Sequence, residues 1–147
     1  MKQITVTEVE YLSHRLAKEL FKFNEPIPDF TTRFPHRLES CLATPFLEFA
    51  KSSFYPTLVS KASILFYLMI KNHPFQNGNK RIAITTLLVF LAKNKKWLVA
   101  DPEELYKFTI WIAESFALSK DGTVQAIEKF ISSHLDELKN SPATDNS

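Results

Sequence analysis

Glycine is scarce in this chain, which has two glycines among its 147 residues. Strands joined by tight turns depend on glycine for left-handed backbone, whereas helices do not need it. Thirteen phenylalanines supply core volume instead. The composition therefore predicts an all-α helical bundle. The length predicts a single domain, which we expect over residues 1–140, followed by a disordered polar tail at residues 141–147.

Cysteine, net charge and long apolar runs are also in short supply. The single cysteine, Cys41, excludes an intramolecular disulfide and is expected to be buried filler in a reducing compartment. A net charge of +2, without a run of Lys and Arg, argues against direct nucleic-acid binding. The apolar runs Ile64–Ile70 and Ile82–Ala92 are shorter than the ~20 residues that cross a bilayer, and the first ten residues show no secretory signal. We therefore expect a cytoplasmic protein with no membrane partner.

Helical spacing of apolar residues, together with capping residues, places most of the chain in helices. Thr7 and Glu10 predict a capping box that opens an amphipathic helix running to Phe23, and the proline-containing segment Asn24–Phe30 predicts a loop. Further helices are expected over Phe34–Ala43, from Pro56 to Lys71, from Gly78 or Asn79 to Asn94, from Asp101 to Ala117, and from Thr123 to Leu138. The second and third of these are apolar on nearly every face, which predicts that they are central and buried.

The segment Thr44–Pro56 has no clear helix start and instead alternates along the chain. One set of side chains is Phe46, Glu48 and Ala50, and the other is Leu47, Phe49 and Lys51. Alternation with aromatic residues at both ends is typical of strands, and Ser52-Ser53 could form a turn. We therefore expect a short β-hairpin between Phe46 and Tyr55 in an otherwise helical fold.

The stretch Asn72–Ala83, NHPFQNGNKRIA, places a lone histidine, one of the two glycines and two cations where an apolar helix begins. The first N–H groups of a helix lack partners, and the helix dipole adds partial positive charge there. Lys80 and Arg81 add full positive charges at this disfavoured position, and Gly78 lets a ligand approach the backbone. A bound anion would resolve the conflict, so the pattern predicts a phosphate site facing His73. The same residues also fit an ordinary helix–helix turn with a surface histidine.

The nine residues His73–Arg81, HPFQNGNKR, resemble the signature of the Fic/Doc family, H-P-F-x-(D/E)-G-N-(G/K)-R, at eight positions, counting the free one. The similarity extends over roughly Pro28–Leu118. The family is mostly helical, with a β-hairpin "flap" over the site that matches the hairpin predicted here. Fic-like members transfer AMP, or another phosphate-bearing group, to a protein hydroxyl, whereas Doc-like toxins phosphorylate a target protein.

The resemblance implies a role for each residue of the signature. His73 is expected to be the general base that takes the proton from the attacking Ser, Thr or Tyr hydroxyl. The residues expected to hold the phosphates of ATP or another nucleotide are Gly78, Asn79, Lys80 and Arg81. The residues expected to dock the target protein on the flap are Phe46, Leu47, Glu48, Phe49, Ala50 and Lys51. Lys80 stands where AMP-transferring members commonly have glycine, which favours a Doc-like phosphotransferase.

Two departures from the family pattern qualify this expectation. Asn77 replaces the Asp or Glu that usually holds Mg²⁺, and an amide oxygen lacks the charge that this hard cation prefers. Asn77 thus permits a degenerate fold that only binds nucleotide or a partner, and nucleotidyl transfer is the alternative enzyme activity. The family's inhibitory pattern (S/T)-x-x-x-E-(G/N) has no match, because Phe49 follows the correctly spaced Thr44 and Glu48. Any restraint is thus expected from a separate antitoxin protein.

Overall fold

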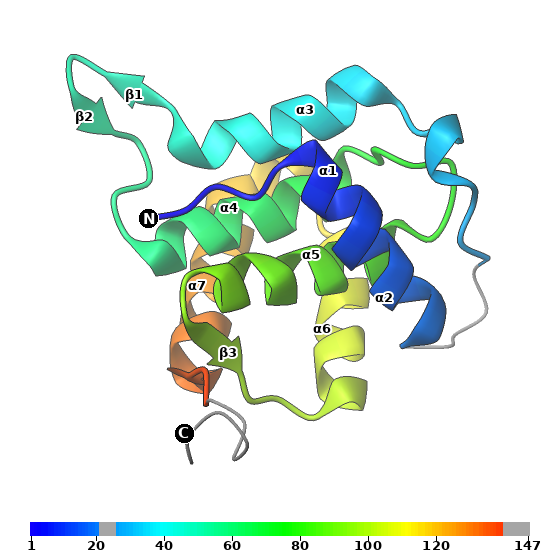
Figure 1. Cartoon of the computed structure of the whole chain (residues 1–147). Helices are drawn as coiled ribbons and strands as arrows, with labels where there is room; N and C mark the ends of the chain where they lie inside the picture. The colour runs from blue at the N-terminus through cyan, green and yellow to red at the C-terminus, as the bar shows by residue number, and fades with distance from the viewer. Residues whose placement is uncertain (21–25, 140–147) are drawn as a thin grey trace, which may run out of the picture.

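The computed structural model describes residues 1–20 and 26–139 and consists of packed helices with two small antiparallel two-stranded sheets (Figure 1). The helices are α1 (Val6–Glu8), α2 (His14–Glu19), α3 (Pro35–Ala43), α4 (Leu58–Lys71), α5 (Asn79–Lys93), α6 (Pro102–Glu114) and α7 (Lys120–His134). The strands are β1 (Glu48–Phe49), β2 (Ser52–Ser53), β3 (Lys96–Leu98) and β4 (Leu135–Glu137). Single 3-10 turns lie at Phe30–Thr32, Thr44–Phe46 and Ala117–Ser119. The predicted all-α fold with a small hairpin is confirmed.

Helices α4 and α5 form the centre of the molecule. Residues 61–70 of α4 and 81–88 of α5 are buried without interruption. The two helices pack on each other, while α3, α6 and α7 cover α4, and α2 and α6 cover α5. Phe66 and Phe90 are among the largest fully buried side chains. Nearly all-round apolar character thus correctly predicted the central position of both helices. In the part of the chain that the structure describes, no helix combines the length and apolarity needed to cross a bilayer.

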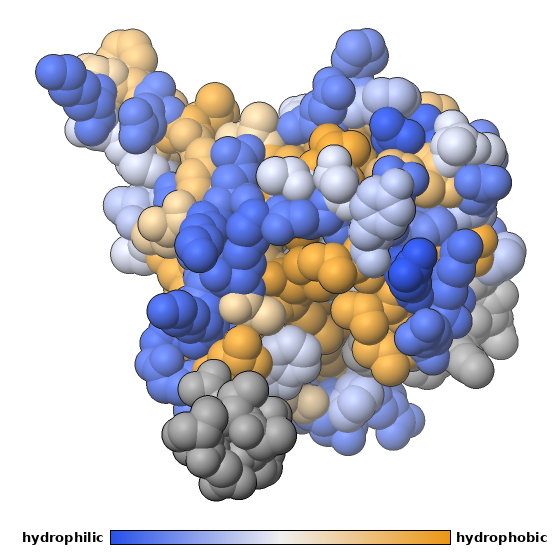
Figure 2. Space-filling view, in the orientation of Figure 1, coloured by the Kyte–Doolittle hydropathy of each residue, from blue (hydrophilic) through white to orange (hydrophobic). Residues whose placement is uncertain are grey.

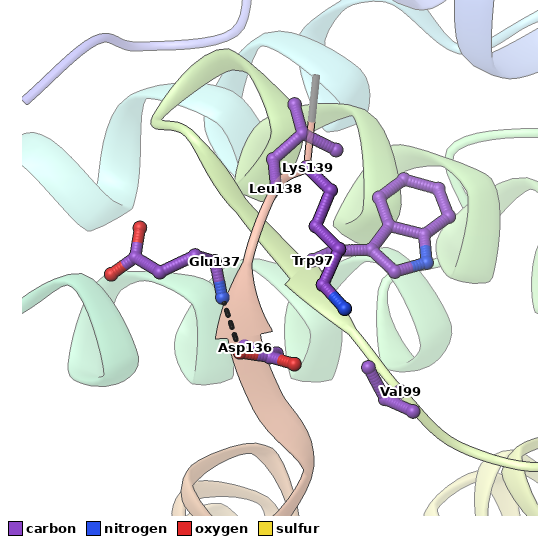
Figure 3. A pocket seen from close by; sticks show the side chains of 6 residues that line it. All are labelled: Trp97, Val99, Asp136, Glu137, Leu138 and Lys139. Carbon is purple, nitrogen blue, oxygen red and sulfur yellow. Dashed lines mark hydrogen bonds between the residues drawn. The ribbon is translucent and has the colours of Figure 1, made fainter. Parts of the chain in front are cut away.

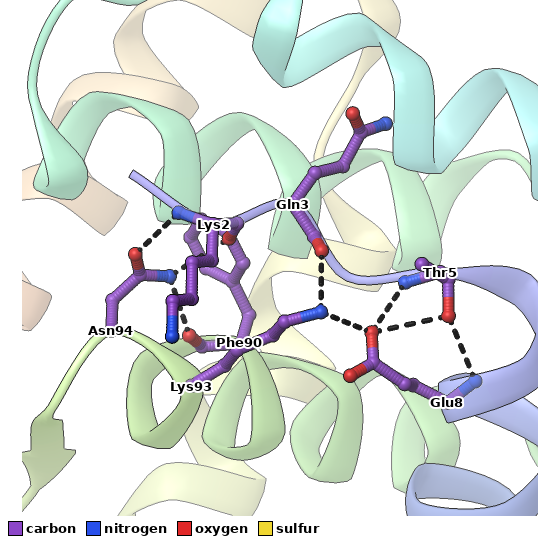
Figure 4. A network of polar contacts seen from close by, with 7 residues as sticks. All are labelled: Lys2, Gln3, Thr5, Glu8, Phe90, Lys93 and Asn94. Carbon is purple, nitrogen blue, oxygen red and sulfur yellow. Dashed lines mark hydrogen bonds and ion pairs between the residues drawn. The ribbon is translucent and has the colours of Figure 1, made fainter.

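The first helix begins two residues earlier than predicted. Its capping box is formed by Thr5 and Glu8, whose side chains each bond the other residue's backbone N–H. The same spacing recurs at Thr7 and Glu10, and the sequence does not show which pair is used. The choice follows from packing, because Lys93 Nζ at the end of α5 lies 2.5 Å from Glu8 Oε1 and donates to the Gln3 carbonyl (Figure 4).

The same helix continues through a π-turn, Val9–Ser13, into α2 and ends at Glu19. The Ser13 carbonyl there accepts a hydrogen bond from Thr85 Oγ1 of α5, at 2.7 Å. Leu20 already has extended backbone. The predicted end at Phe23 and the predicted disordered tail both fall outside the described residues.

The predicted hairpin is confirmed as β1 and β2, with Glu48 paired to Ser53 and Phe49 to Ser52. Its turn lies at Ala50 and Lys51, which have left-handed φ values of 52° and 68°. The expectation of a Ser52-Ser53 turn is therefore wrong. Two-residue hairpin turns need positive φ at both central positions and usually contain Asn or Gly, so Ala and Lys gave no signal. The hairpin projects from the body of the molecule (Figures 1 and 2).

A second two-stranded sheet was not predicted. Strand β3 pairs with β4, which directly follows α7 (Figure 3). Leu98 lies opposite Leu135 in this pair. Helix α7 consequently ends at His134 instead of Leu138. Helix α7 starts at Lys120, before the predicted Thr123, so Gly122 lies in its first turn. Helix α6 ends at Glu114, before the predicted Ala117. A cavity of about 400 Å³ beside this sheet is lined by Trp97, Val99, Asp136, Glu137, Leu138 and Lys139.

Helices α3 and α4 follow their predictions closely. Helix α3 starts one residue late, and Leu38 and Leu42 point inward and are buried. Helix α4 is capped by Thr57 and Ser60, so Pro56 lies just outside the helix and not in its first turn. Cys41 is buried on α3, and burial raises the pKa of its thiol to about 12, which fits the expected filler role.

Candidate active site

His73 lies in the loop that joins the two central helices, and its side chain is exposed to solvent. Its φ of 48° is left-handed, a conformation that non-glycine residues rarely adopt. The residue before a proline is also restricted toward extended backbone, and Pro74 follows His73 directly. Backbone held in so disfavoured a conformation needs support from its surroundings.

That support comes from the N-terminal turn of α3. The Phe34 N–H donates to the Pro74 carbonyl at 2.9 Å, and Arg37 Nη1 donates to the His73 carbonyl at 3.2 Å. Two consecutive carbonyl groups of the loop are thus held by one turn of a helix far away in the sequence. Sequence reasoning missed both residues. The only local signal was the doubled pattern FTTRFPHR over residues 30–37.

Asn79 holds the other side of the loop. Its Oδ1 accepts from the Phe75 N–H at 2.9 Å, and its Nδ2 donates to the Phe75 carbonyl at 2.8 Å. Asn79 is 8% exposed, so both bonds are shielded from water. The side chain of this residue therefore fixes the loop, whereas its expected contact with phosphate stays a prediction.

Phe75 anchors the loop in the core. It is fully buried, and its ring centroid lies 5.8 Å from Phe30 and 5.9 Å from His14. The neutral His14 ring reaches the Pro28 carbonyl through Nε2 at 2.8 Å. Burial lowers the pKa of His14, and the hydrogen bond to Pro28 only partly opposes this effect.

Gly78 caps α5 with left-handed backbone, at φ 71°. A Cβ atom at this position would lie 2.6 Å from Ile27 Cδ1 and 3.1 Å from the Pro26 carbonyl oxygen. The close approach that requires glycine is therefore made by the chain's own Pro26–Ile27 segment. The expectation that this glycine makes room for a ligand remains untested.

Lys80 and Arg81 occupy the first turn of α5, as predicted, but they differ in environment. Lys80 is half-buried, whereas Arg81 is 5% exposed. Arg81 Nη2 donates to the carbonyls of Ala17 and Leu20 at the C-terminal end of α2. Cations are favoured at such helix ends, where carbonyls lack partners and the dipole is negative. Arg81 thus ties α2 to α5, and its pairing with a distal phosphate remains a prediction.

The geometry of the loop does not by itself identify the protein family, whereas comparison with protein-family models does. A model described as the Fic/DOC family matches residues 3–91, which is more than half of the chain. The chain belongs to the Fic/DOC family. The matched region extends from the N-terminal segment through most of α5 and includes the loop with His73. None of the curated proteins and none of the solved structures compared with the chain matches it.

Membership of the Fic/DOC family indicates a general class of activity. The family comprises enzymes that use nucleotide substrates and transfer nucleotide-derived groups to proteins, and its members often pair with antitoxins.

A Mg²⁺ site does not form from the residues present. The Asn77 side chain is neutral, and its Oδ1 already accepts the Gly78 N–H at 2.8 Å. Within residues 1–20 and 26–139, no group of three His, Cys, Asp or Glu side chains could hold a metal ion. Mg²⁺ at nucleotide sites is usually held by one or two carboxylates together with the phosphates. The loop supplies no carboxylate for that role, because residues 72–78 contain neither Asp nor Glu.

The hairpin of this Fic/DOC domain lies away from His73. The hairpin precedes the first turn of α4, and His73 follows its last turn (Figure 1). The 14 residues of α4 span about 21 Å at roughly 1.5 Å per residue. A target strand docked on the hairpin would have to cover this length before its hydroxyl reached His73.

Lys61 of α4 fixes the base of the hairpin. Its Nζ donates to the Pro45 carbonyl at 3.0 Å and to Ser53 Oγ at 3.1 Å, and lies 4.7 Å from the centroid of the Phe46 ring. Phe46 itself is half-buried against Phe90, so it is part of the support. The exposed members of the expected docking set are Leu47, Glu48, Phe49, Ala50 and Lys51.

Proposed function

We propose that the chain is a Doc-like enzyme that transfers the γ-phosphoryl group of ATP to a hydroxyl side chain of a target protein. The observation that carries this proposal is the exposed imidazole of His73. It lies on backbone that hydrogen bonds hold from two sides, in the loop that leads to a helix N-terminus carrying Lys80 and Arg81. A base held beside an anion-attracting helix start has the arrangement that phosphoryl transfer requires.

His73 serves as the general base in this reaction. Its neutral imidazole takes the proton of the target hydroxyl while the hydroxyl oxygen forms a bond to the γ-phosphorus. The bond from that phosphorus to the bridging oxygen breaks, and the nucleoside diphosphate leaves. The partial positive charge of the N-terminus of α5, with the positive charge of Lys80, stabilises the negative charge of the phosphates. The imidazole must then lose its proton to solvent, which its exposure allows.

Lys80 favours phosphoryl transfer over nucleotidyl transfer. By the resemblance stated above, glycine at this position accompanies AMP transfer, and lysine accompanies a different placement of the nucleotide. The test is to incubate the chain with cell lysate and ATP labelled at either the α- or the γ-phosphate. Label from the γ-phosphate alone on protein is the expected result. Protein labelled from the α-phosphate would instead establish nucleotidyl transfer.

A binding-only role is the second candidate, and two observations favour it. The neutral Asn77 lacks the charge expected of a metal ligand, and the Arg81 guanidinium bonds the carbonyls of α2. A chain with this role would bind ATP in a calorimeter and yet transfer neither label. We further propose a separate antitoxin as a partner, because the family's inhibitory pattern has no match in the sequence.

A further inference from the structure

Arg33 and Arg37 form a matched pair at the start of α3. Each stacks on the phenylalanine three residues before it, with Cζ 4.4 Å from the Phe30 centroid and 4.2 Å from the Phe34 centroid. Each also donates from Nη1 to a backbone carbonyl. Arg33 bonds the Phe30 carbonyl of its own turn, at 3.4 Å, whereas Arg37 bonds His73, 36 residues away, at 3.2 Å. The two residues therefore differ in what they hold, and also in burial, since Arg33 is half-buried and Arg37 is exposed.

Arg37 holds the carbonyl of His73, the residue with the strained backbone. The peptide group between His73 and Pro74 has the His73 carbonyl but no N–H, because Pro74 lacks one. A hydrogen bond that fixes the orientation of this peptide group next to left-handed His73 must therefore be made to the carbonyl. The charged guanidinium makes a stronger hydrogen bond to this carbonyl than a neutral donor would. The neighbouring bond from the Phe34 N–H holds Pro74 but leaves the orientation of the His73 carbonyl to Arg37.

We infer that Arg37 is a positioning residue that keeps His73 in its left-handed conformation and thereby aims the imidazole. This inference rests on the proposed role of His73 as the base. Arg37 need not contact ATP or the reacting atoms, because it acts through the backbone of His73. The stacked Phe34 ring restricts the guanidinium in advance, so the hydrogen bond to the carbonyl loses less side-chain entropy.

The test compares Arg37→Met, Arg37→Lys and the control Arg33→Met. Methionine retains an apolar stem over the aromatic ring but removes the donors. We expect Arg37→Met to lower kcat for γ-label transfer by about 10-fold to 100-fold, the scale of a misplaced catalytic group, with KM for ATP unchanged. Arg37→Lys, which keeps one charged donor, should recover part of the loss. Arg33→Met should stay within about twofold of wild type, the size of a change that leaves the base in place.

A second measurement does not depend on activity. The ¹³Cα and ¹³Cβ chemical shifts of His73 report whether its backbone is left-handed or extended. They should move toward extended values in Arg37→Met and remain unchanged in Arg33→Met. Equal loss of kcat in both methionine variants, or a rise in KM for ATP without a fall in kcat, would overturn the inference.

The two proposals can fail separately. If wild type transfers no label, or if His73→Ala transfers as much as wild type, the proposed function is wrong. The chemical shifts then decide about Arg37 alone, and unchanged His73 shifts in Arg37→Met would refute its positioning role. The thermal midpoints of the two methionine variants should agree, because each loses one hydrogen bond to a backbone carbonyl and retains the packing of its stem. A much lower midpoint for Arg37→Met alone would contradict local positioning.

Discussion

The loop with His73 and the hairpin β1–β2 lie at opposite ends of α4 and are held in different ways. Hydrogen bonds from α3 and from Asn79 fix three consecutive residues of the loop, and Phe75 anchors it in the core. The hairpin is held at its base, through Lys61 and Phe46, and Phe49 near its tip is 74% exposed. Chemistry needs fixed geometry, whereas docking tolerates adaptation, so the comparison suggests a division of labour.

The largest expected effect comes from removing the base at the pinned end. His73→Ala should lower γ-label transfer by at least ~10²-fold, the usual scale for loss of a general base, without unfolding the chain. His36→Ala is the control, because His36 is a fully exposed histidine on α3 whose contact is an ion pair with Glu39. Transfer by His73→Ala within a few-fold of the control variant would show that the base lies elsewhere.

Asn79→Ala should release the same loop. The substitution leaves the buried N–H and carbonyl of Phe75 without their present partners. Each unsatisfied buried group costs about 1–3 kcal/mol, so we expect the free energy of unfolding to fall by about 3 kcal/mol. Urea denaturation measures this loss. Thr109→Val, which removes a buried side-chain bond within α6, is a control remote from the loop. A loss no greater than that of the control would mean that the loop does not depend on the Asn79 side chain.

Asn77→Asp tests whether the loop lacks only a charge. One carboxylate oxygen can still accept the Gly78 N–H, which leaves the other for Mg²⁺. We expect a lower Mg²⁺ requirement and transfer about 10-fold faster, a change that corresponds to about 1.4 kcal/mol of barrier. Calorimetric titration of Mg²⁺ with a non-hydrolysable ATP analogue provides a readout without turnover. Slower transfer at every Mg²⁺ concentration would show that the amide has a role of its own.

Local sequence patterns predicted the hairpin and the His73 loop at the two ends of α4, but not the distant residues that support them. The segment Phe46–Tyr55 alternates visibly, and HPFQNGNKR marks the loop, so both appear in a single sequence. The residues that support them come from distant segments: Arg37 is 36 residues from His73, and Arg81 is 64 residues from Ala17. Strands β3 and β4 pair across 41 residues for the same reason. Such contacts depend on packing, which local periodicity does not encode.

The hairpin end can be loosened by Lys61→Met, which keeps the buried stem and removes the donors to Pro45 and Ser53. The Phe54 N–H, which bonds the Leu47 carbonyl, should then exchange faster with deuterium. Target modification should fall only by about threefold, since a lost hydrogen bond contributes roughly 0.5–1.5 kcal/mol, while KM for ATP stays unchanged. Lys71→Met is the control, because Lys71 bonds carbonyls at the other end of α4. Equal losses of target modification and ATP binding would argue against a docking hairpin.

Acid should destabilise the His73 loop before the hairpin. We expect this to be the smallest of the predicted effects. The His14 ring packs against Phe75, and burial holds its pKa below the usual 6.5. Between the lowered folded pKa and 6.5 the unfolded chain binds more protons, so stability rises with pH in that window. As pH falls below 6.5, stability should decrease until the folded pKa is passed.

His14→Gln should remove this part of the pH dependence, whereas His36→Gln, at an exposed position, should retain it. Urea midpoints measured from pH 8 to pH 5 provide the comparison, with amide exchange locating the change. A pH dependence that persists in His14→Gln, or acid-induced exchange that begins in the hairpin, would show that His14 does not connect protonation to the loop.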